Sequence, residues 1–139
     1  MNFKDIKPFF EQNHRGVVTT RRRNGAVQAS IVASGVMGDA VVFVSRGDSA
    51  KIANIKRDPG CTVMATKADW SSYAVVEGTA EIRGWDNLDP EQLRLLLRDA
   101  YRACGSGEHP DWEEYDWVMR DERRSVVLVK PSHVYGLNR

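Results

Sequence analysis

One short segment of the sequence combines residue types that bind anions. Between Ser45 and Asn54, a β-branched run ends in a Gly-containing turn, and the residues that follow predict the start of a helix. Free backbone N–H groups at a helix N-terminus attract anions, and the hydroxyls of Ser45 and Ser49, the ammonium of Lys51 and the Asn54 amide add donors. The segment therefore predicts a cradle for a phosphate or carboxylate. A solvated helix start with ordinary capping is the alternative that the pattern leaves open.

A second basic feature, Arg21–Arg23, comes directly before Asn24-Gly25, the strongest short hairpin signal. Alternate strand residues point to opposite faces, so the three arginines cannot address one ligand without a bulge. An exposed hairpin tip kept soluble by its charge is the favoured interpretation. The alternative is a guide for the anionic tail of a ligand.

The remaining reactive residue types form no recognisable catalytic or metal-binding pattern. The three histidines, His14, His109 and His133, are scattered, and each is more readily structural or exposed than a metal ligand. Cys61 and Cys104 form no Cys-x-x-Cys or Cys/His cluster, so neither a zinc site nor a disulfide framework is predicted. A protein with an anion cradle but no acid, base or metal of its own often takes its chemistry from a cofactor.

Composition and charge narrow the class of protein. The 139 residues, with 42% hydrophobic and 28% charged residues, suit one soluble domain spanning 1–139. A net charge of +1 disfavours a nucleic-acid partner. The total conceals a split, because residues 1–57 have ten basic and four acidic side chains, whereas residues 58–139 have ten and fifteen. We find no signal peptide and no apolar run long enough to span a membrane, so we expect a cytoplasmic protein.

The elements that must position these residues follow from hydrophobic periodicity. Helices are predicted at about 2–13, 49–57 and 89–104 and from residue 111, and strands at 16–20, 26–33, 40–45, 61–66, 73–83 and 125–130. In the second strand Val27, Ala29, Ile31 and Ala33 share one face, and Pro131 is expected to bend the chain after the last strand. Six strands joined mostly by hairpins predict a mainly β, α+β fold, namely a small antiparallel barrel with flanking helices. No G-x-G-x-x-G or P-loop motif supports a common nucleotide-binding fold.

The motifs of this chain and their order along it resemble those of the flavin/deazaflavin oxidoreductases of the pyridoxamine 5'-phosphate oxidase-like split-barrel superfamily. The resemblance is strongest to the branch that binds the deazaflavin coenzyme F420. The segments that carry this resemblance are 16–20, 24–25, 28–30, 45–59, 70–80, 107–112 and 132–137. The pattern Lys-x-x-Asn-(x)3-Asp-Pro, which begins at Lys51, marks the superfamily. The strand that begins at Tyr73 and the sequence Ser-His-Val-Tyr-Gly at 132–136 mark the deazaflavin branch more narrowly.

The resemblance implies a homodimeric split β-barrel with two equivalent cofactor clefts at the subunit interface. It implies that the phosphate and ribityl region is held by Ser45, Ser49, Ala50, Lys51 and Asn54; that the ring is lined by Gln28, Ser30 and Ile31; and that the neighbouring subunit contributes Trp70 and Tyr73. This chain departs from the family pattern at Ser49, where an arginine is common, and Arg46 is the candidate replacement.

The expected function is that of an F420-dependent reductase, which transfers a hydride from the reduced deazaflavin to a conjugated, electron-poor small molecule. The alternatives are an oxidoreductase of the same fold that uses flavin mononucleotide (FMN), a carrier that holds the deazaflavin without turnover, and, least favoured, a nucleic-acid-binding barrel. No single catalytic residue is predicted, because solvent or a water bound to an arginine could protonate the product. We expect no nucleic-acid, membrane or metal partner.

Overall fold

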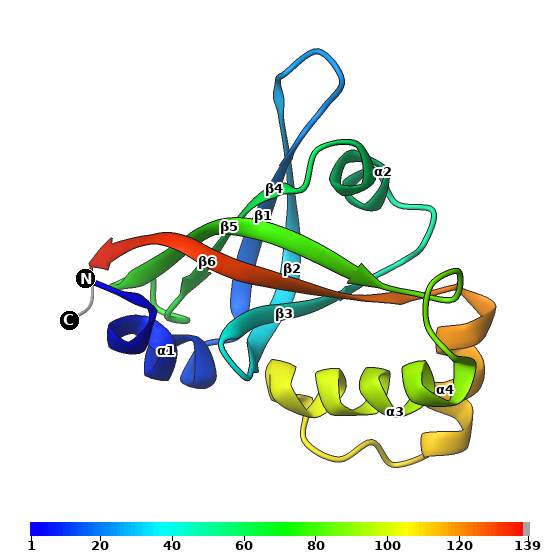
Figure 1. Ribbon diagram of the computed structural model, residues 1–139. Helices are drawn as coiled ribbons and strands as arrows, with labels where there is room; N and C mark the ends of the chain where they lie inside the picture. Colours follow the sequence, from blue (N-terminus) through cyan, green and yellow to red (C-terminus); the bar gives the residue numbers. More distant parts are fainter. Residues whose placement is uncertain (138–139) are drawn as a thin grey trace.

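The computed structural model describes residues 1–137 of the chain (Figure 1). Its elements in order are α1 (Phe3–Gln12), β1 (Arg15–Arg21), β2 (Val27–Met37), β3 (Ala40–Ser45), α2 (Ala50–Arg57), β4 (Gly60–Thr66), β5 (Tyr73–Arg83), α3 (Pro90–Tyr101), a π-helical turn η1 (Arg102–Ser106), α4 (Trp112–Asp121) and β6 (Ser125–Leu137). This is the element order that the periodicity predicts. In this part of the chain, no helix is long and apolar enough to cross a membrane.

The six strands close into one antiparallel barrel in the order β1-β2-β3-β6-β5-β4, with β4 pairing back onto β1. The first three strands form an antiparallel meander, and β5 and β6 form the longest ladder. The predicted six-stranded antiparallel barrel with flanking helices, of the α+β class, is thus confirmed.

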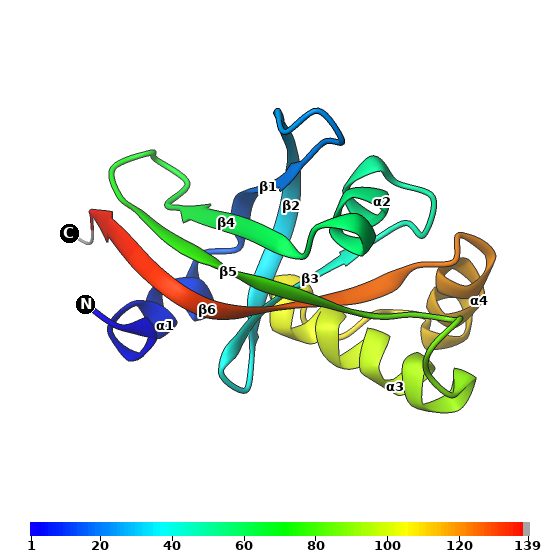
Figure 2. The same cartoon turned by 45° about the horizontal axis from the view of Figure 1, so that its top comes forward.

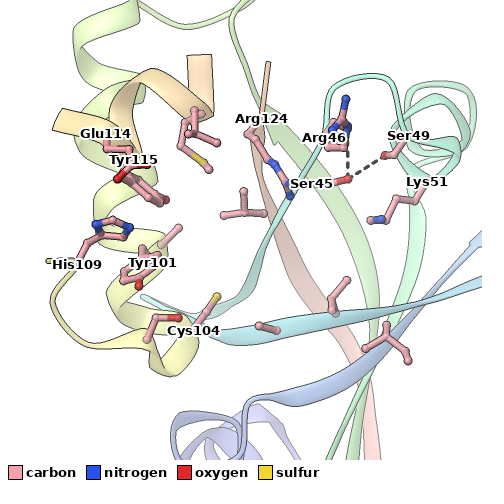
Figure 3. Close-up of a pocket in the computed structure, with 18 residues that line it drawn as sticks. Ser45, Arg46, Ser49, Lys51, Tyr101, Cys104, His109, Glu114, Tyr115 and Arg124 are labelled. Atoms are coloured by element: carbon pink, nitrogen blue, oxygen red, sulfur yellow. Dashed lines mark hydrogen bonds between the residues drawn. The ribbon is translucent and has the colours of Figure 1, made fainter. Parts of the chain in front are cut away.

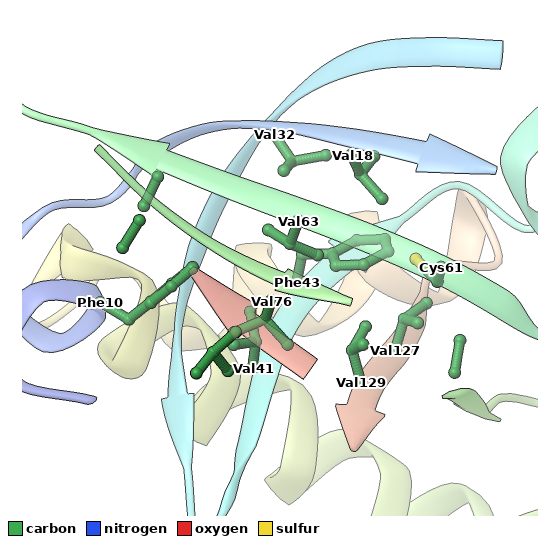
Figure 4. Packing of buried hydrophobic residues seen from close by; sticks show 14 of the residues in the cluster. Phe10, Val18, Val32, Val41, Phe43, Cys61, Val63, Val76, Val127 and Val129 are labelled. Atoms are coloured by element: carbon green, nitrogen blue, oxygen red, sulfur yellow. The ribbon is translucent and has the colours of Figure 1, made fainter. Parts of the chain in front are cut away.

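Inward-facing valines and aromatic rings fill the barrel (Figure 4). Val18, Val41, Phe43 and Val63 are fully buried there, and α1 adds the buried ring of Phe10. These residues alternate with outward-facing ones along their strands, as the pleat requires. Helix α2 packs on the same core through Ile52 and Ile55, which are both buried.

A second core lies outside the barrel, where α3 and α4 cover β3 and β6 (Figure 2). Val42 points out of β3 into this layer and packs with Leu93, Leu97 and Tyr115. The strand β3 is therefore buried on both faces, as its uninterrupted apolar sequence predicts. Both helices begin at an aspartate cap: the Asp89 carboxylate accepts the Gln92 N–H, and the Asp111 carboxylate accepts the Glu114 N–H, each at 3.1 Å.

Two strands run further than predicted. β2 continues to Met37, and its apolar face, with Ile31 87% exposed, points outward rather than into the barrel. β6 continues through Pro131 to Leu137. The register with β5 shifts at Glu77/Gly78, opposite Pro131, and such a bulge accommodates a residue without an N–H.

Candidate functional site

A cavity of about 630 Å³ lies between the barrel and the helical layer (Figure 3). Residues of β2, β3, the start of α2, the end of α3, η1, the loop after it, α4 and the approach to β6 surround it. The residues that line it are Ile31, Val32, Ala33, Val44, Ser45, Arg46, Ser49, Lys51, Ala100, Tyr101, Cys104, Ser106, His109, Glu114, Tyr115, Val118, Met119 and Arg124. The cavity has one end rich in hydroxyls and cations and another rich in aromatic side chains.

The hydroxyl end is built where β3 passes into α2. The Oγ atoms of Ser45 and Ser49 lie 2.8 Å apart, and the Ser49 Oγ also accepts the Ile52 N–H at 3.3 Å as the helix cap. Ser45 is buried, so its hydroxyl is fixed in place rather than free in solvent. The turn thus presents two hydrogen-bonding hydroxyls beside the first turn of α2.

Lys51 and Arg124 supply positive charge at this end. Lys51 forms no ion pair within residues 1–137, and partial burial and the nearby Arg124 guanidinium lower the pKa of its ammonium. The Arg124 Nε donates to Glu122 Oε1 at 3.0 Å. Two cations that repel each other at the end of a cavity favour binding of an anion between them, because the anion removes that repulsion.

The predicted replacement cation, Arg46, has carboxylate partners of its own. Its Nε lies 3.2 Å from Asp48 Oδ1, and its NH1 group lies 3.1 Å from Glu122 Oε2. Arg46 lines the cavity, but these two carboxylates neutralise its charge. Glu122 pairs with Arg124 as well, but Arg46 has Asp48 as a second partner and its side chain is 51% exposed against 30% for Arg124, so Arg124 is better placed to act with Lys51.

Aromatic rings form the opposite wall. The Tyr101 and His109 ring centroids are 5.2 Å apart and those of His109 and Tyr115 are 5.4 Å apart, in edge or tilted arrangements. Tyr115 is buried, its hydroxyl donates to the Leu97 carbonyl at 2.7 Å, and burial raises the pKa of its phenol. Cys104 also lines this end, and burial raises the pKa of its thiol to about 12, so it remains a neutral thiol.

The loop between η1 and α4 carries His109 and is held by polar contacts. The Arg102 Nε donates to Glu108 Oε1 at 2.8 Å, and the Arg102 guanidinium lies 4.7 Å from the Trp112 ring centroid. The His109 Nδ1 accepts the Asp111 N–H at 2.9 Å. This loop therefore presents the His109 ring in one fixed orientation.

The structure brings five of the predicted site residues to this cavity: Ile31, Ser45, Arg46, Ser49 and Lys51. Ala50 begins α2 beside them but does not line the cavity. Asn54 is buried, donates to Thr20 Oγ1 at 3.1 Å and accepts from Arg57 at 3.0 Å, so its amide is engaged between α2 and β1.

The other predicted residues lie elsewhere. Gln28 and Ser30 share the face of β2 opposite Ile31, because alternate strand residues point to opposite faces. Trp70 is 81% exposed and borders a separate depression of about 330 Å³ that Ile31 also lines. Tyr73 begins β5 and lines neither hollow.

Sequence reasoning missed the residues that complete the cavity, above all Arg124, His109, Tyr101 and Tyr115. Arg124 belongs to an Arg-Arg pair before a predicted strand, which is a weak signal of an anion site. The helical periodicity of residues 89–104 places Tyr101 on an apolar stripe and indicates no ligand contact, and the isolated position of His109 favours a structural or exposed role. Within residues 1–137, no group of three or more His, Cys, Asp or Glu side chains is arranged to hold a metal ion.

Known proteins share this architecture. A sequence profile for the family described as pyridoxamine 5'-phosphate oxidase matches residues 3–138. A conserved hypothetical protein from Mycobacterium tuberculosis has a similar structure, with a TM-score of 0.77, 20% identity, and coverage of 99% of this chain and 85% of the other.

Two further solved structures carry functional names. An F420 reductase aligns with a TM-score of 0.64 and 22% identity, covering 93% of this chain and 94% of its own. A heme-binding protein from Mycobacterium smegmatis aligns with a TM-score of 0.69 and 16% identity, covering 99% of this chain and 54% of its own. At these identities the likeness to the three structures concerns the fold.

Proposed function

Since the chain belongs to the pyridoxamine 5'-phosphate oxidase family, we propose that it is an oxidoreductase that binds coenzyme F420 and passes a hydride from it to a conjugated small molecule. The observation that carries the proposal is the cavity itself, which joins a cationic, hydroxyl-lined end to an apolar and aromatic end. A phosphorylated cofactor with a planar ring needs both surfaces in one continuous site.

The residues present suit such a cofactor. Ser45, Ser49, Lys51 and Arg124 would hold the phosphate, and Lys51 has no partner within residues 1–137 that an incoming anion must displace. When bound, the deazaflavin supplies a hydride. The protein contributes binding, orientation and exclusion of water, to which the aromatic wall and Ile31 contribute by lining the cavity.

A second copy of the chain is the proposed partner. The outer face of β2 exposes Val27 and Ile31 at 60% and 87%, and Trp70 stands beside it in a loop at 81% exposure. Contact between two such faces would remove these side chains from water at roughly 25 cal/mol for each Å² of apolar area buried. The depression shared by Ile31 and Trp70 would then lie at the subunit interface.

A paired titration of the purified protein tests the cofactor. We expect F420 to bind with a change in its fluorescence, and FMN to bind more weakly. Tight binding of FMN without binding of F420 would replace the proposal with the flavin alternative. The bound, reduced F420 is then mixed with enones, quinones and tetrapyrroles. Oxidation that depends on an acceptor supports a reductase, whereas binding with no oxidation across the panel supports a carrier.

A further inference from the structure

We propose that His109 is the hydrogen-bond donor to the molecule that this protein reduces, and that it gives the site a preference for acceptors with a carbonyl oxygen. This inference rests on the proposed function and adds a residue and a substrate feature to it. It is carried by the hydrogen bonding of the imidazole, by the packing that fixes the ring and by its place in the cavity.

The first step is the tautomer of the ring. The His109 Nδ1 accepts the backbone N–H of Asp111 at 2.9 Å. A nitrogen that accepts a hydrogen bond carries no proton, so the neutral ring carries its proton on Nε2. No hydrogen-bond partner takes this Nε2–H within residues 1–137.

The second step is the position of the ring. Tyr101, Trp112 and Tyr115 pack around His109 at centroid distances of 5.2 to 5.7 Å and so restrict its rotation. His109 lines the same cavity as Lys51, at the aromatic end, whereas Lys51 lies at the cationic end (Figure 3). A cofactor anchored by its phosphate at Lys51 would extend its ring toward the aromatic end, so the molecule that takes its hydride would meet the ring beside His109.

The third step is the chemistry that this donor suits. When a hydride adds to the β-carbon of an α,β-unsaturated ketone, its electron pair forms the new C–H bond. The π electrons of the C=C bond move toward the carbonyl, whose oxygen becomes an enolate oxygen. A fixed N–H aimed at that oxygen stabilises the charge as it develops. A proton from solvent water then adds at the α-carbon and completes the saturated ketone.

The same geometry makes His109 a poor ligand for heme iron. A histidine that binds a metal through Nε2 needs a lone pair there and usually donates its Nδ1–H to a carbonyl or carboxylate. Here Nδ1 faces a donor instead. Titration with hemin is therefore one arm of the test, and a Soret band in the wild type that His109→Gln abolishes would overturn the proposal.

The tautomer is tested by NMR of the ¹⁵N-labelled imidazoles in the full-length protein. The chain has three histidines, so His109→Gln identifies the His109 signals. His14 is an internal reference for the opposite tautomer, because its Nδ1 donates to the Ser34 carbonyl at 2.8 Å. We expect the Nε2–H form at His109. The Nδ1–H form at His109 would overturn the proposal without any reference to a cofactor.

The donor role is tested by kinetics with F420 and cyclohex-2-enone. We expect His109→Phe to lower kcat roughly 10²-fold with little change in F420 affinity, and His109→Gln, which keeps an N–H, to recover part of it. His133→Phe, at an exposed position on β6, is the matched control. An unchanged kcat in His109→Phe would refute the inference about His109 and leave the proposed function standing. If the wild type fails to bind F420 or to reduce the enone, the proposed function fails and the inference fails with it.

Discussion

Lys51 and Arg124 face the same end of the cavity from distant parts of the chain, and the guanidinium of Arg124 helps to lower the pKa of the Lys51 ammonium. Lys51 lies in the first turn of α2, whereas Arg124 directly precedes β6. The ends of β3 and β6 bring the two together, because these strands pair in the barrel with Ser45 opposite Ser125. The anion site is thus a product of strand pairing.

Removing either cation should weaken cofactor binding. A hydrogen bond to a charged group is worth about 1.5–3 kcal/mol, so we expect Lys51→Met or Arg124→Met to raise the Kd for F420 roughly tenfold to a hundredfold. Arg46→Met is the matched control, since that guanidinium has two carboxylate partners, Asp48 and Glu122, whereas Arg124 pairs only with Glu122 among residues 1–137. Fluorescence titration measures all three. An effect of Arg46→Met as large as that of Lys51→Met would contradict the assignment.

The pH dependence of F420 binding should follow the protonation of the Lys51 side chain. An anion binds the protonated ammonium, and burial together with Arg124 sets the pKa of Lys51 below the ordinary lysine value of about 10.4. Affinity for F420 should therefore be full below this lowered pKa and decline as the pH rises through it. An arginine keeps its charge at higher pH, so in Lys51→Arg the loss of F420 affinity should occur at a higher pH. Identical profiles for the two proteins would exclude Lys51 as the titrating group.

A charge on the outer face of β2 should separate the proposed dimer. Ile31→Lys places an ammonium at the centre of the exposed apolar strip, where association would have to desolvate it. Sedimentation is expected to change from twice the 15.7 kDa chain mass to the monomer mass. Leu95→Lys, at a 48% exposed position on α3, is the control and should leave the mass unchanged. A wild type that sediments as a monomer would contradict the partner proposal.

Gly35 should be essential for stability, because it lets η1 approach β2. A Cβ at Gly35 would lie 2.0 Å from the Ala103 carbonyl oxygen. Gly35→Ala should therefore lower the free energy of unfolding by about 1–3 kcal/mol or more, measured by urea denaturation. Gly25 at the hairpin tip is the comparison: its φ of +86° strains an alanine, but nothing lies within 4 Å of the added Cβ. Gly25→Ala should cost only about 1–2 kcal/mol.

Both cysteines should resist alkylation in the folded protein. Burial raises the pKa of Cys61 and of Cys104 to about 12, so almost no thiolate is present near pH 8. Iodoacetamide should label neither thiol until denaturant unfolds the chain, as mass spectrometry can show. Rapid labelling of Cys104 in the native protein would mean that the aromatic end of the cavity opens widely.

Short-range sequence patterns predict most of the secondary structure and part of the anion site. The period-two apolar pattern, the turn at Asn24-Gly25 and the caps Ser49, Asp89 and Asp111 predict the elements and their order, because these signals act between residues close in the chain. The hydroxyls of Ser45 and Ser49 and the charge of Lys51 are likewise adjacent in sequence. The sequence is therefore sufficient to predict an antiparallel barrel and one half of the anion cradle.

The other half of the anion cradle depends on the tertiary structure. Strand pairing brings Arg124 to Lys51, and packing of the helical layer on β3 places His109 across the cavity; no local pattern encodes either approach. Nor can alternation alone say which face of β2 is inside, since the apolar Ile31 points out and the polar Ser30 points to the opposite side. Barrel closure fixes that orientation, because it requires all six strands to turn their inner faces to one core.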